Sequence, residues 1–431
     1  MASVSEIKAQ IDHPVIDADG HLIEFVPVVR ELLEAEAGAD VVARFDQLIN
    51  GSTLIRGIDT DDRRALGLSR TSWWGLPAAN TLDRATAMLP ALQYERLDEL
   101  GLDVALLYPT YGLTVTAHPD HELRPAMARA FNQYAAAAYA PYADRLVPVA
   151  TIPMYTPDEA IAELHHAVGE LGMKAVMMAG VVARPVPGLD HRGARYMNGV
   201  GHDSEFDYDP VWQTCVDLGV VPTFHAAGMG WGSRTSRTNY VYNHIGNFAA
   251  AGEAACRSIL FGGAAKRFPT LRFAFQEGGV AWGQNLLADT LGHYEKRNRD
   301  AIEHYNPARL DRSLLAELVS KHGDARVAGH LDRLDEALFM LSDPEEDLAT
   351  LDEFAEAGIE SAADIVAIFA NQFFFGCEAD DPMNAMAFDD SYTGTKLPAV
   401  FASDIGHWDV PDITEVLPEA WELVEDGHLT T

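Results

Sequence analysis

Two side chains of the types that bind metal ions stand close together near the N-terminus. Asp19 and His21 follow the apolar pair Val15-Ile16 and are separated by one glycine. Residues i and i+2 of a strand point to the same face, so both side chains could contact one ion. Curvature of the backbone would let Asp17 join them. Alone, this motif fits a solvated turn as well as a metal site.

Two later apolar runs end in residues of the same kind. His225 closes the run 220–225, and Asp404 follows the run 399–402. Two imidazoles and two carboxylates form a ligand set that suits Zn²⁺, Mn²⁺ or Fe²⁺. We therefore predict that Asp19, His21, His225 and Asp404 hold one divalent ion.

The predicted ligands end or follow short apolar runs that are typical of buried parallel strands. The runs are 15–18, 104–108, 146–152, 175–178, 220–225, 271–275, 373–377 and 399–402. Helical patterns lie between them at 125–139, 157–171, 210–218, 247–261 and 282–300, and a last one follows at 413–425. This alternation predicts an α/β fold, a (β/α)₈ TIM-like barrel, whose catalytic groups lie at the carboxyl ends of the strands.

Three insertions are longer than ordinary connections between barrel elements. They cover residues 25–100, 181–210 and 300–365, and the last contains amphipathic helical patterns at 310–322 and 345–357. Long insertions in a compact domain are usually lids or interface elements. We therefore interpret residues 1–431 as a single barrel domain with helical insertions that form a cap.

The chain is strongly acidic. It has 65 Asp and Glu against 31 Lys and Arg, a formal net charge of −34. Contacts to phosphate need clustered cations, so nucleic acid and anionic membranes are not expected partners. Three cysteines without a CxxC motif indicate a reducing compartment, and no apolar run approaches the ~20 residues of a membrane span. We expect a cytoplasmic protein that acts on a small molecule.

Four further residues could form a second layer around the first ion. Glu24 lies three residues beyond His21, His407 lies three beyond Asp404, Glu277 ends a predicted strand, and His244 precedes a predicted helix. Each could instead cap a helix or orient a ligand. Together Glu24, His244, Glu277 and His407 could hold a second ion, and such mixed ligation suits Fe or Mn.

Several of these motifs resemble the amidohydrolase superfamily. The motifs are 19–21 (DGH), 225–228 (HAAG), 277–279 (EGG) and 403–407 (SDIGH), together with the run 261–271. They are most similar to the amidohydrolase-related branch that includes aminocarboxymuconate-semialdehyde decarboxylase and γ-resorcylate decarboxylase. The resemblance implies a (β/α)₈ barrel with a divalent ion held by Asp19, His21, His225 and Asp404.

The chain departs from the decarboxylases at several positions. They often place a catalytic histidine where this chain has Glu277, and Lys174 begins rather than ends its strand, which does not support a carbamylated bridging lysine. Glu24 and His407 are instead similar to a sub-branch that resembles dinuclear Mn/Fe or diiron oxygenases. Family members commonly continue beyond this C-terminus, so a truncated tail is expected.

Two enzymatic functions and one non-enzymatic role follow. The first is a metal-dependent hydrolase or carboxy-lyase of a small carboxylate-bearing molecule. Its expected catalytic residues are Asp404, Glu277, His244 and His407, with Arg234, Arg237 and Tyr108 as substrate contacts. The second is a dinuclear non-haem oxygenase, and the third is an inactive subunit paired with an active paralogue. One ion is the first expectation and two the alternative; a homo-oligomer, a dimer, is also expected.

Overall fold

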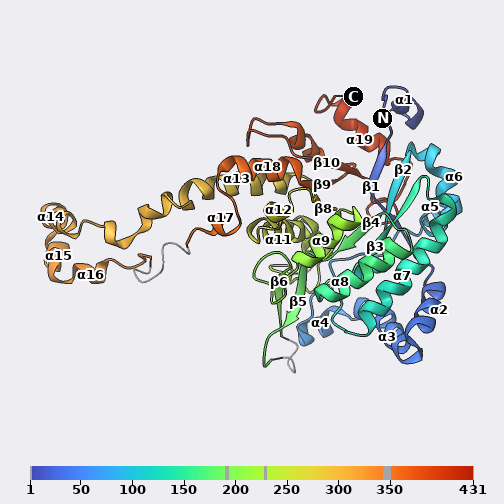
Figure 1. Cartoon of the computed structure of the whole chain (residues 1–431), viewed down its shortest axis with the longest axis horizontal. Helices are drawn as coiled ribbons and strands as arrows, with labels where there is room; N and C mark the ends of the chain where they lie inside the picture. The colour runs from blue at the N-terminus through green and yellow to red at the C-terminus, as the bar shows by residue number, and fades with distance from the viewer. Residues whose placement is uncertain (1, 190–193, 228–230, 343–350, 431) are drawn as a thin grey trace.

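The computed structural model describes residues 2–189, 194–227, 231–342 and 351–430, with only the backbone of 50–57. Within these residues, eight parallel strands form one sheet in the order β1-β2-β3-β4-β7-β8-β9-β10 (Figure 1). The strands are β1 (Ile16–Leu22), β2 (Val104–Pro109), β3 (Leu146–Thr151), β4 (Ala175–Met178), β7 (Pro222–Phe224), β8 (Phe273–Phe275), β9 (Phe373–Glu378) and β10 (Ala399–Ala402). All eight predicted strands are confirmed.

The first and last strands close the sheet into a barrel. The amide of Asp404 donates to the carbonyl of Asp19 over 2.8 Å, and the amide of His21 donates to the carbonyl of Ile405 over 3.0 Å. The contact therefore continues beyond the end of β10, into the loop that carries a predicted ligand. This arrangement confirms the (β/α)₈ barrel.

Apolar side chains fill both sides of the barrel wall, which explains why the strand runs are nearly continuous in the sequence. Every residue of β4, β7 and β8 is buried. Inside the barrel, Tyr108, Val149 and Met177 form a small cluster. Outside it, aromatic rings such as those of Phe224 and Phe275, 5.5 Å apart, pack in the layer between strands and helices.

Helices surround the barrel at or near the predicted positions. They include α7 (Leu123–Tyr139), α8 (Pro157–Leu164), α9 (Asp209–Leu218), α11 (Asn247–Phe261), α13 (Ala281–Arg297) and α19 (Val416–Glu425). A further helix, α18 (Ala362–Asn371), was not predicted. The predicted helix 157–171 is divided, because a π-helical stretch at His165–Glu170 follows α8. No helix within the described residues combines the length and the apolar character needed to cross a membrane.

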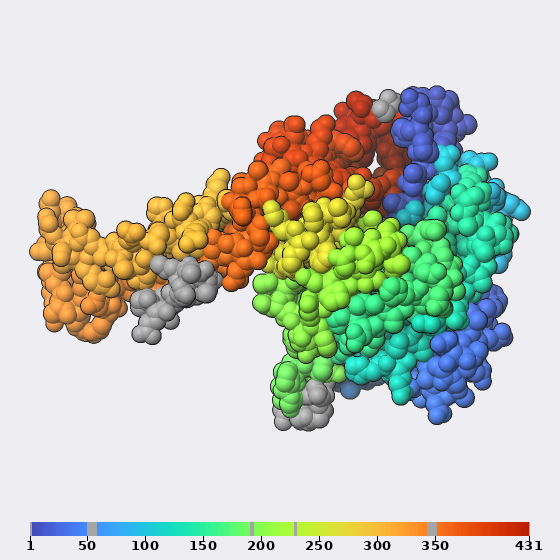
Figure 2. All heavy atoms as spheres, viewed as in Figure 1, coloured from blue at the N-terminus to red at the C-terminus, as the bar shows by residue number. Residues whose placement is uncertain are grey.

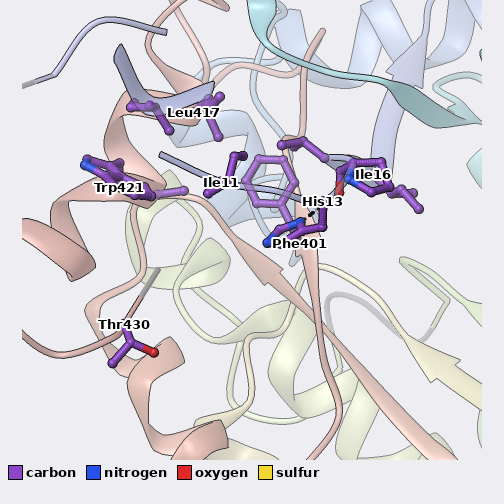
Figure 3. A pocket seen from close by; sticks show the side chains of 11 residues that line it. Ile11, His13, Ile16, Phe401, Leu417, Trp421 and Thr430 are labelled. Carbon is purple, nitrogen blue, oxygen red and sulfur yellow. Dashed lines mark hydrogen bonds between the residues drawn. The ribbon is translucent and has the colours of Figure 1, made fainter. Parts of the chain in front are cut away.

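The N-terminal helix α1 (Val4–Lys8) packs against α19 beside the start of β1. A cavity of about 360 Å³ lies there, between residues of the N-terminal segment and side chains such as Phe401 and Trp421 (Figure 3). Its lining contains none of the predicted metal ligands, so it is not the candidate catalytic site.

The insertion at 25–100 lies beside the barrel mouth. It forms α2 (Val26–Ala37), α3 (Ala39–Gly57), α4 (Thr60–Leu66), α5 (Thr81–Met88) and α6 (Pro90–Leu100). The segment between α4 and α5 brings the Trp73 ring to 4.7 Å from the ring of His407. This insertion therefore reaches the strand ends.

The other two insertions differ from each other. Residues 181–210 contain an antiparallel hairpin of β5 (Val181–Pro185) and β6 (Arg195–Gly199). The 300–365 insertion contains α14 (Arg312–His322), α15 (Ala325–Ala328), α16 (Leu334–Ala337) and α17 (Glu353–Glu356). Its helices α14–α16 project away from the barrel instead of covering its mouth as part of a cap (Figures 1 and 2). The first part of the second predicted helix, residues 345–350, lies outside the described residues.

Strand β1 contains an irregularity next to its predicted ligands. Asp17 pairs with Ala105 but Gly20 pairs with Leu107, so β1 has one more residue than β2 over this stretch, a β-bulge. Asp17 accepts hydrogen bonds from the amide of Ser403 (3.0 Å) and from its hydroxyl (2.6 Å). This pair ties β1 to the loop after β10.

Substitution of Gly20 by alanine is expected to destabilise the barrel closure. A Cβ at this position would lie 2.5 Å from Oδ2 of Asp17 and 3.3 Å from Oγ of Ser403. Such overpacking costs about 1–3 kcal/mol of unfolding free energy, which calorimetry would detect as a lower Tm. Gly292→Ala in α13 is the control, since its Cβ would meet nothing within 4 Å. Equal Tm values for the two variants would contradict the tight closure.

Candidate metal centre

Six ionisable side chains meet at the carboxyl ends of the barrel strands, and we call them the ligand cluster. They are Asp19, His21, His225, Glu277, Asp404 and His407. Each is at most 5 % exposed. The structure therefore brings together all four residues predicted for the first ion and two of the four predicted for a second.

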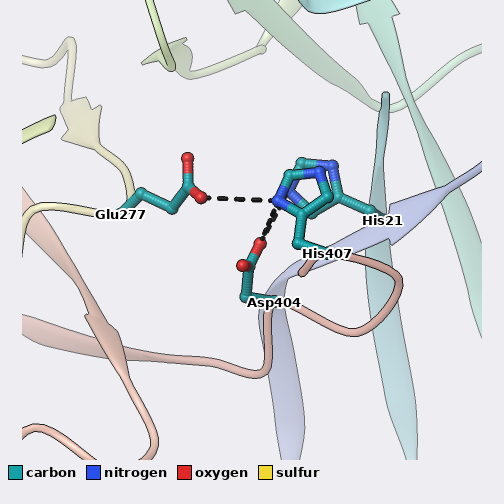
Figure 4. Close-up of side chains that lie close together, drawn as sticks. All are labelled: His21, Glu277, Asp404 and His407. Atoms are coloured by element: carbon teal, nitrogen blue, oxygen red, sulfur yellow. Dashed lines mark ion pairs between the residues drawn. The ribbon is translucent and has the colours of Figure 1, made fainter. Parts of the chain in front are cut away.

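The cluster consists of two groups of ligand atoms that share His21. In the first group, Nε2 of His225 lies 3.3 Å from Nε2 of His21 and 3.5 Å from Oδ1 of Asp19. In the second, Oδ1 of Asp404 lies 3.1 Å from Nε2 of His21 and 2.6 Å from Nδ1 of His407 (Figure 4). The atoms of each group lie within 4.8 Å of one another.

Glu277 spans both groups. Its Oε2 lies 3.1 Å from Nε2 of His225, and its Oε1 lies 3.4 Å from Nδ1 of His407. The rings of His21 and His407 stack with their centroids 3.4 Å apart. One carboxylate thus faces a histidine of each group, a position from which it could bridge two ions.

The buried carboxylates of the ligand cluster need a cation to balance their charge. Among the described residues, the ion-pair partners of its three carboxylates are all histidines. Burial raises the pKa of Asp19, Glu277 and Asp404, and it lowers the pKa of His21 and His407. Buried carboxylates need a counter-charge, and neutral imidazoles cannot supply one.

The hydrogen-bond inventory supports the same conclusion. Both carboxylate oxygens of Asp19 are buried without a hydrogen-bond partner, and so is Nδ1 of both His21 and His225. Three imidazoles and three carboxylates offer nitrogen and oxygen donors that suit Zn²⁺, Mn²⁺ or Fe²⁺. The residues present therefore fit a divalent ion.

The backbone is strained where the strands deliver these side chains. Ala226 after β7, Glu277 after β8 and Asp404 after β10 have φ values of 56°, 58° and 50°. Non-glycine residues rarely adopt this left-handed conformation, and it costs of order 1–3 kcal/mol each. Packing of the rest of the barrel maintains these strained conformations. The left-handed backbone in turn directs the ligand side chains toward one point.

The structure does not bring Glu24 into the ligand cluster. Its two carboxylate oxygens accept hydrogen bonds from the amides of Tyr111 (3.0 Å) and Gly112 (2.9 Å). Glu24 therefore fixes the loop after β2, which corrects its predicted role as a ligand of a second ion.

His244 also lies outside both groups of ligand atoms. It ends α10 (Tyr240–His244), where its ring packs 5.1 Å from Tyr240, 5.7 Å from Phe248 and 5.3 Å from Trp408. Its Nε2, the Tyr240 hydroxyl and Nε1 of Trp408 are buried without hydrogen-bond partners in the described structure. His244 thus belongs to an aromatic group beside the cluster rather than to the metal centre.

The three predicted substrate contacts are placed differently from the prediction. The Tyr108 hydroxyl points into the barrel, where it donates to Oγ1 of Thr223 (2.8 Å) and accepts from Gln276 (2.9 Å). Arg234 donates to the carbonyl of Ile245 (3.1 Å), and Arg237 is exposed. The described structure therefore shows no arginine clamp in contact with the cluster.

Two acidic residues near the cluster were not selected from the sequence. Glu378 ends β9, and its burial together with the nearby charge of Asp409 raises its pKa to about 8. Asp409 also contributes to the raised pKa of Asp404. Their positions, at a strand end and two residues beyond His407, are the sequence signals that could have identified them.

A mostly apolar cavity, which we call the mouth cavity, adjoins the ligand cluster. Its volume is about 450 Å³. Trp73 lines it and also contacts His407, and Ala226, which directly follows His225, lies in its wall. The other lining residues include Trp74, Phe131 and Thr110, and the described lining contains no charged side chain.

His225→Ala should remove the bound metal while the barrel stays folded. The substitution deletes a nitrogen donor from the first group, so we expect metal affinity to fall by more than about 10-fold. Elemental analysis after dialysis would measure this loss. The control is His244→Ala, which changes a nearby histidine outside the cluster and should retain the metal. Equal metal contents in the two variants would contradict the assignment.

Glu24 should make the stability of the protein depend on pH. Burial raises its pKa from 4.5 to about 7. The folded state therefore binds the proton more tightly, and the free energy of unfolding falls as pH rises from about 4.5 through about 7, by up to about 3 kcal/mol. Urea unfolding at a series of pH values, in the presence of a chelator, would measure this change. Over this pH range the free energy of unfolding of wild type should fall by this amount relative to that of Glu24→Gln.

Glu6→Gln is a control of opposite sign for this experiment. Hydrogen bonds from Ser3 lower the pKa of Glu6, so its contribution to stability appears as pH rises. A difference between wild type and Glu24→Gln that stays constant with pH would contradict the effect assigned to Glu24.

The solved structures that this chain matches include two decarboxylases with bound manganese. One is 5-carboxyvanillate decarboxylase from Novosphingobium aromaticivorans, at 15 % identity and a TM-score of 0.47, covering 94 % of this chain and 89 % of that chain. The other is dihydroxybenzoic acid decarboxylase from Polaromonas, at 14 % identity and a TM-score of 0.49, covering 97 % and 100 %. The 2,6-dihydroxybenzoate decarboxylase from Rhizobium is 16 % identical, with a TM-score of 0.40 and coverage of 83 % and 96 %.

No curated protein matches the chain at a significant level. The family described as Amidohydrolase matches residues 16–340, a span that begins at β1 and covers well over half of the chain. The barrel agrees with this match, and the chain belongs to the amidohydrolase family.

Proposed function

We propose that this protein is a metal-dependent hydrolase or carboxy-lyase whose small substrate has an apolar body and a carboxyl or carbonyl group. The observation that carries the proposal is the buried ligand cluster beside the mouth cavity, whose described lining is uncharged. The charged ligand cluster, where the reaction would occur, thus lies beside the apolar cavity that would bind the body of the substrate.

Asp19, His21, His225 and Asp404 would hold the ion. When bound, such an ion polarises a carbonyl or carboxylate oxygen and lowers the pKa of water. These residues lie at three strand ends, so the ion would hold the reacting group of the substrate at the inner end of the mouth cavity.

In this proposal, protons are transferred by Asp404, Glu277 and His407. Hydrolysis requires a base to take a proton from the attacking water and an acid to return one to the leaving group. Decarboxylation breaks a carbon–carbon bond, releases CO₂ and requires a proton for the carbon left behind. Asp404 accepts a proton in this proposal, and Nδ1 of His407, 2.6 Å from it, lies close enough to exchange that proton.

The mouth cavity supports an apolar body for the substrate. Cavities that bind small molecules usually have volumes of about 300–1,000 Å³ and few, well-placed polar groups. Thr110, whose buried hydroxyl has no hydrogen-bond partner in the described structure, is such a group here. The uncharged lining and the positions of Arg234 and Arg237 argue against a carboxylate clamp remote from the ion.

The test is turnover by protein loaded with Mn²⁺ or Zn²⁺. The substrates would be hydrophobic aromatic acids, assayed for CO₂ release, and the matching esters and amides, assayed for hydrolysis. We expect turnover of one class that a chelator abolishes and added metal restores. Turnover that survives complete metal removal would contradict the proposal.

A second candidate is a dinuclear oxygenase, and the position of Glu277 between His225 and His407 favours it. Metal content after anaerobic purification distinguishes the two functions. Two equivalents of Fe or Mn per chain, together with oxygen uptake that depends on substrate, would support the oxygenase. One equivalent without oxygen uptake would rule it out. An inactive subunit paired with a paralogue would show no turnover with any metal.

Trp73→Ala should weaken substrate use without loss of metal. Trp73 joins the mouth cavity to the ligand cluster, so its removal is expected to lower kcat/KM by about 10–100-fold. The control is Tyr392→Ala, which removes an aromatic side chain that is 68 % exposed and outside the described lining. Unchanged kcat/KM in Trp73→Ala would place substrate binding elsewhere.

A further inference from the structure

Residues 307–342, which we call the arm, extend far from the barrel (Figures 1 and 2). The arm follows α13 and precedes α17, and it contains α14, α15 and α16. None of its residues is buried. It is therefore a segment with defined helices but without a core of its own.

The arm exposes many apolar side chains. Leu314 and Leu318 are 49 % and 44 % exposed, Val327 is 52 %, Phe339 is 76 % and Met340 is 91 %. Leu314 and Leu318 are four residues apart on α14, so they lie on one face of the helix. Monomeric proteins rarely expose extended apolar surfaces, and such surfaces mark interaction sites.

The length of α14 leads to the same conclusion. This helix has 11 residues and no buried side chain. Isolated helices shorter than about 12–15 residues are marginal in water, and most helices in proteins are stabilised by packing of an apolar face. The apolar face of α14 therefore needs another protein surface to pack against it.

The charge of the arm indicates which kind of protein surface packs against it. The arm has five basic and six acidic residues, so nearly all of the net charge of −34 lies elsewhere in the chain. Three of its four arginines also pair within the arm: Arg312 with Asp335 at 3.0 Å, Arg326 with Asp324, and Arg333 with Glu336. A basic partner would be attracted to the acidic barrel rather than to this neutral arm.

We propose that the arm is the interface of a homodimer, in which the arms of two copies pack against each other about a two-fold axis. An interface of this symmetry must be complementary to itself, which a neutral apolar surface satisfies and an acidic one does not. Stable interfaces use about 20–30 residues a side, and the arm has 36. Contact through the arms also keeps the two acidic barrels apart.

Sedimentation of the full chain over a range of concentrations tests the proposal. Wild type should sediment as a dimer of the 47.0 kDa chain. The double variant Leu314→Glu/Leu318→Glu should raise the dimer Kd by about 100-fold or more, because symmetry places four new charges in the interface. The control is Leu66→Glu/Leu82→Glu, which changes leucines that are 66 % and 52 % exposed outside the arm, and it should dimerise like wild type.

Salt dependence gives a second readout. Raising NaCl from about 0.05 to about 0.5 M screens the repulsion between two acidic barrels, so the dimer should be unchanged or tighter. An interface made of ion pairs would weaken instead.

Hydrogen exchange in wild type needs no substitution and so does not depend on how the variants fold. The amides of α14 should exchange more slowly as protein concentration rises. A monomeric wild type, a double variant that dimerises like wild type, or exchange in α14 that is independent of concentration would each overturn the proposal.

Discussion

The structure depends on one electrostatic constraint: three carboxylates are buried at one end of a barrel, and their described ion-pair partners are histidines. Burial disfavours the charge of Asp19, Glu277 and Asp404, as the direction of their pKa values shows. A fold retains such an arrangement when a cation relieves it. The proposed metal centre, the proposed proton-transfer residues and the proposed position of the substrate all depend on this constraint.

The features around the cluster keep its side chains in place. The contact between Asp17 and Ser403 closes the barrel where the first and last strands supply ligands. Glu24 fixes the loop after β2 through two backbone amides, so a buried acid with a raised pKa serves as a structural residue. Trp73, from an insertion, contacts the charged cluster and also lines the apolar mouth cavity.

The sequence predicted the barrel well because its strands are short apolar runs with buried faces on both sides. It also predicted Asp19, His21, His225 and Asp404, since the ends of parallel barrel strands meet at one mouth. It could not show that the hydroxyl of Tyr108 points into the barrel, because position at a strand end does not fix the direction of a side chain. It could not locate the partner of Asp17, which is 386 residues away in the chain. Residue spacing alone also could not show that the carboxylate of Glu24 accepts hydrogen bonds from the amides of a neighbouring loop.

The arm illustrates a different limit. Its amphipathic pattern predicted α14 correctly, but a pattern does not show which surface covers the apolar face. The prediction of a cap assumed that this surface was the barrel of the same chain. The position of the arm and its near-neutral charge point to a second copy instead.

The most direct test of the metal centre is an anomalous difference map from a crystal grown with Mn²⁺. We predict a peak about 2.0–2.2 Å from the nitrogen and oxygen donors of His21 and Asp19, with His225 and Asp404 also in contact. A second peak about 3.5–4 Å away, beside Glu277 and His407, would identify a dinuclear centre. A map with no peak among these six side chains, at a concentration that supports turnover, would contradict the central claim.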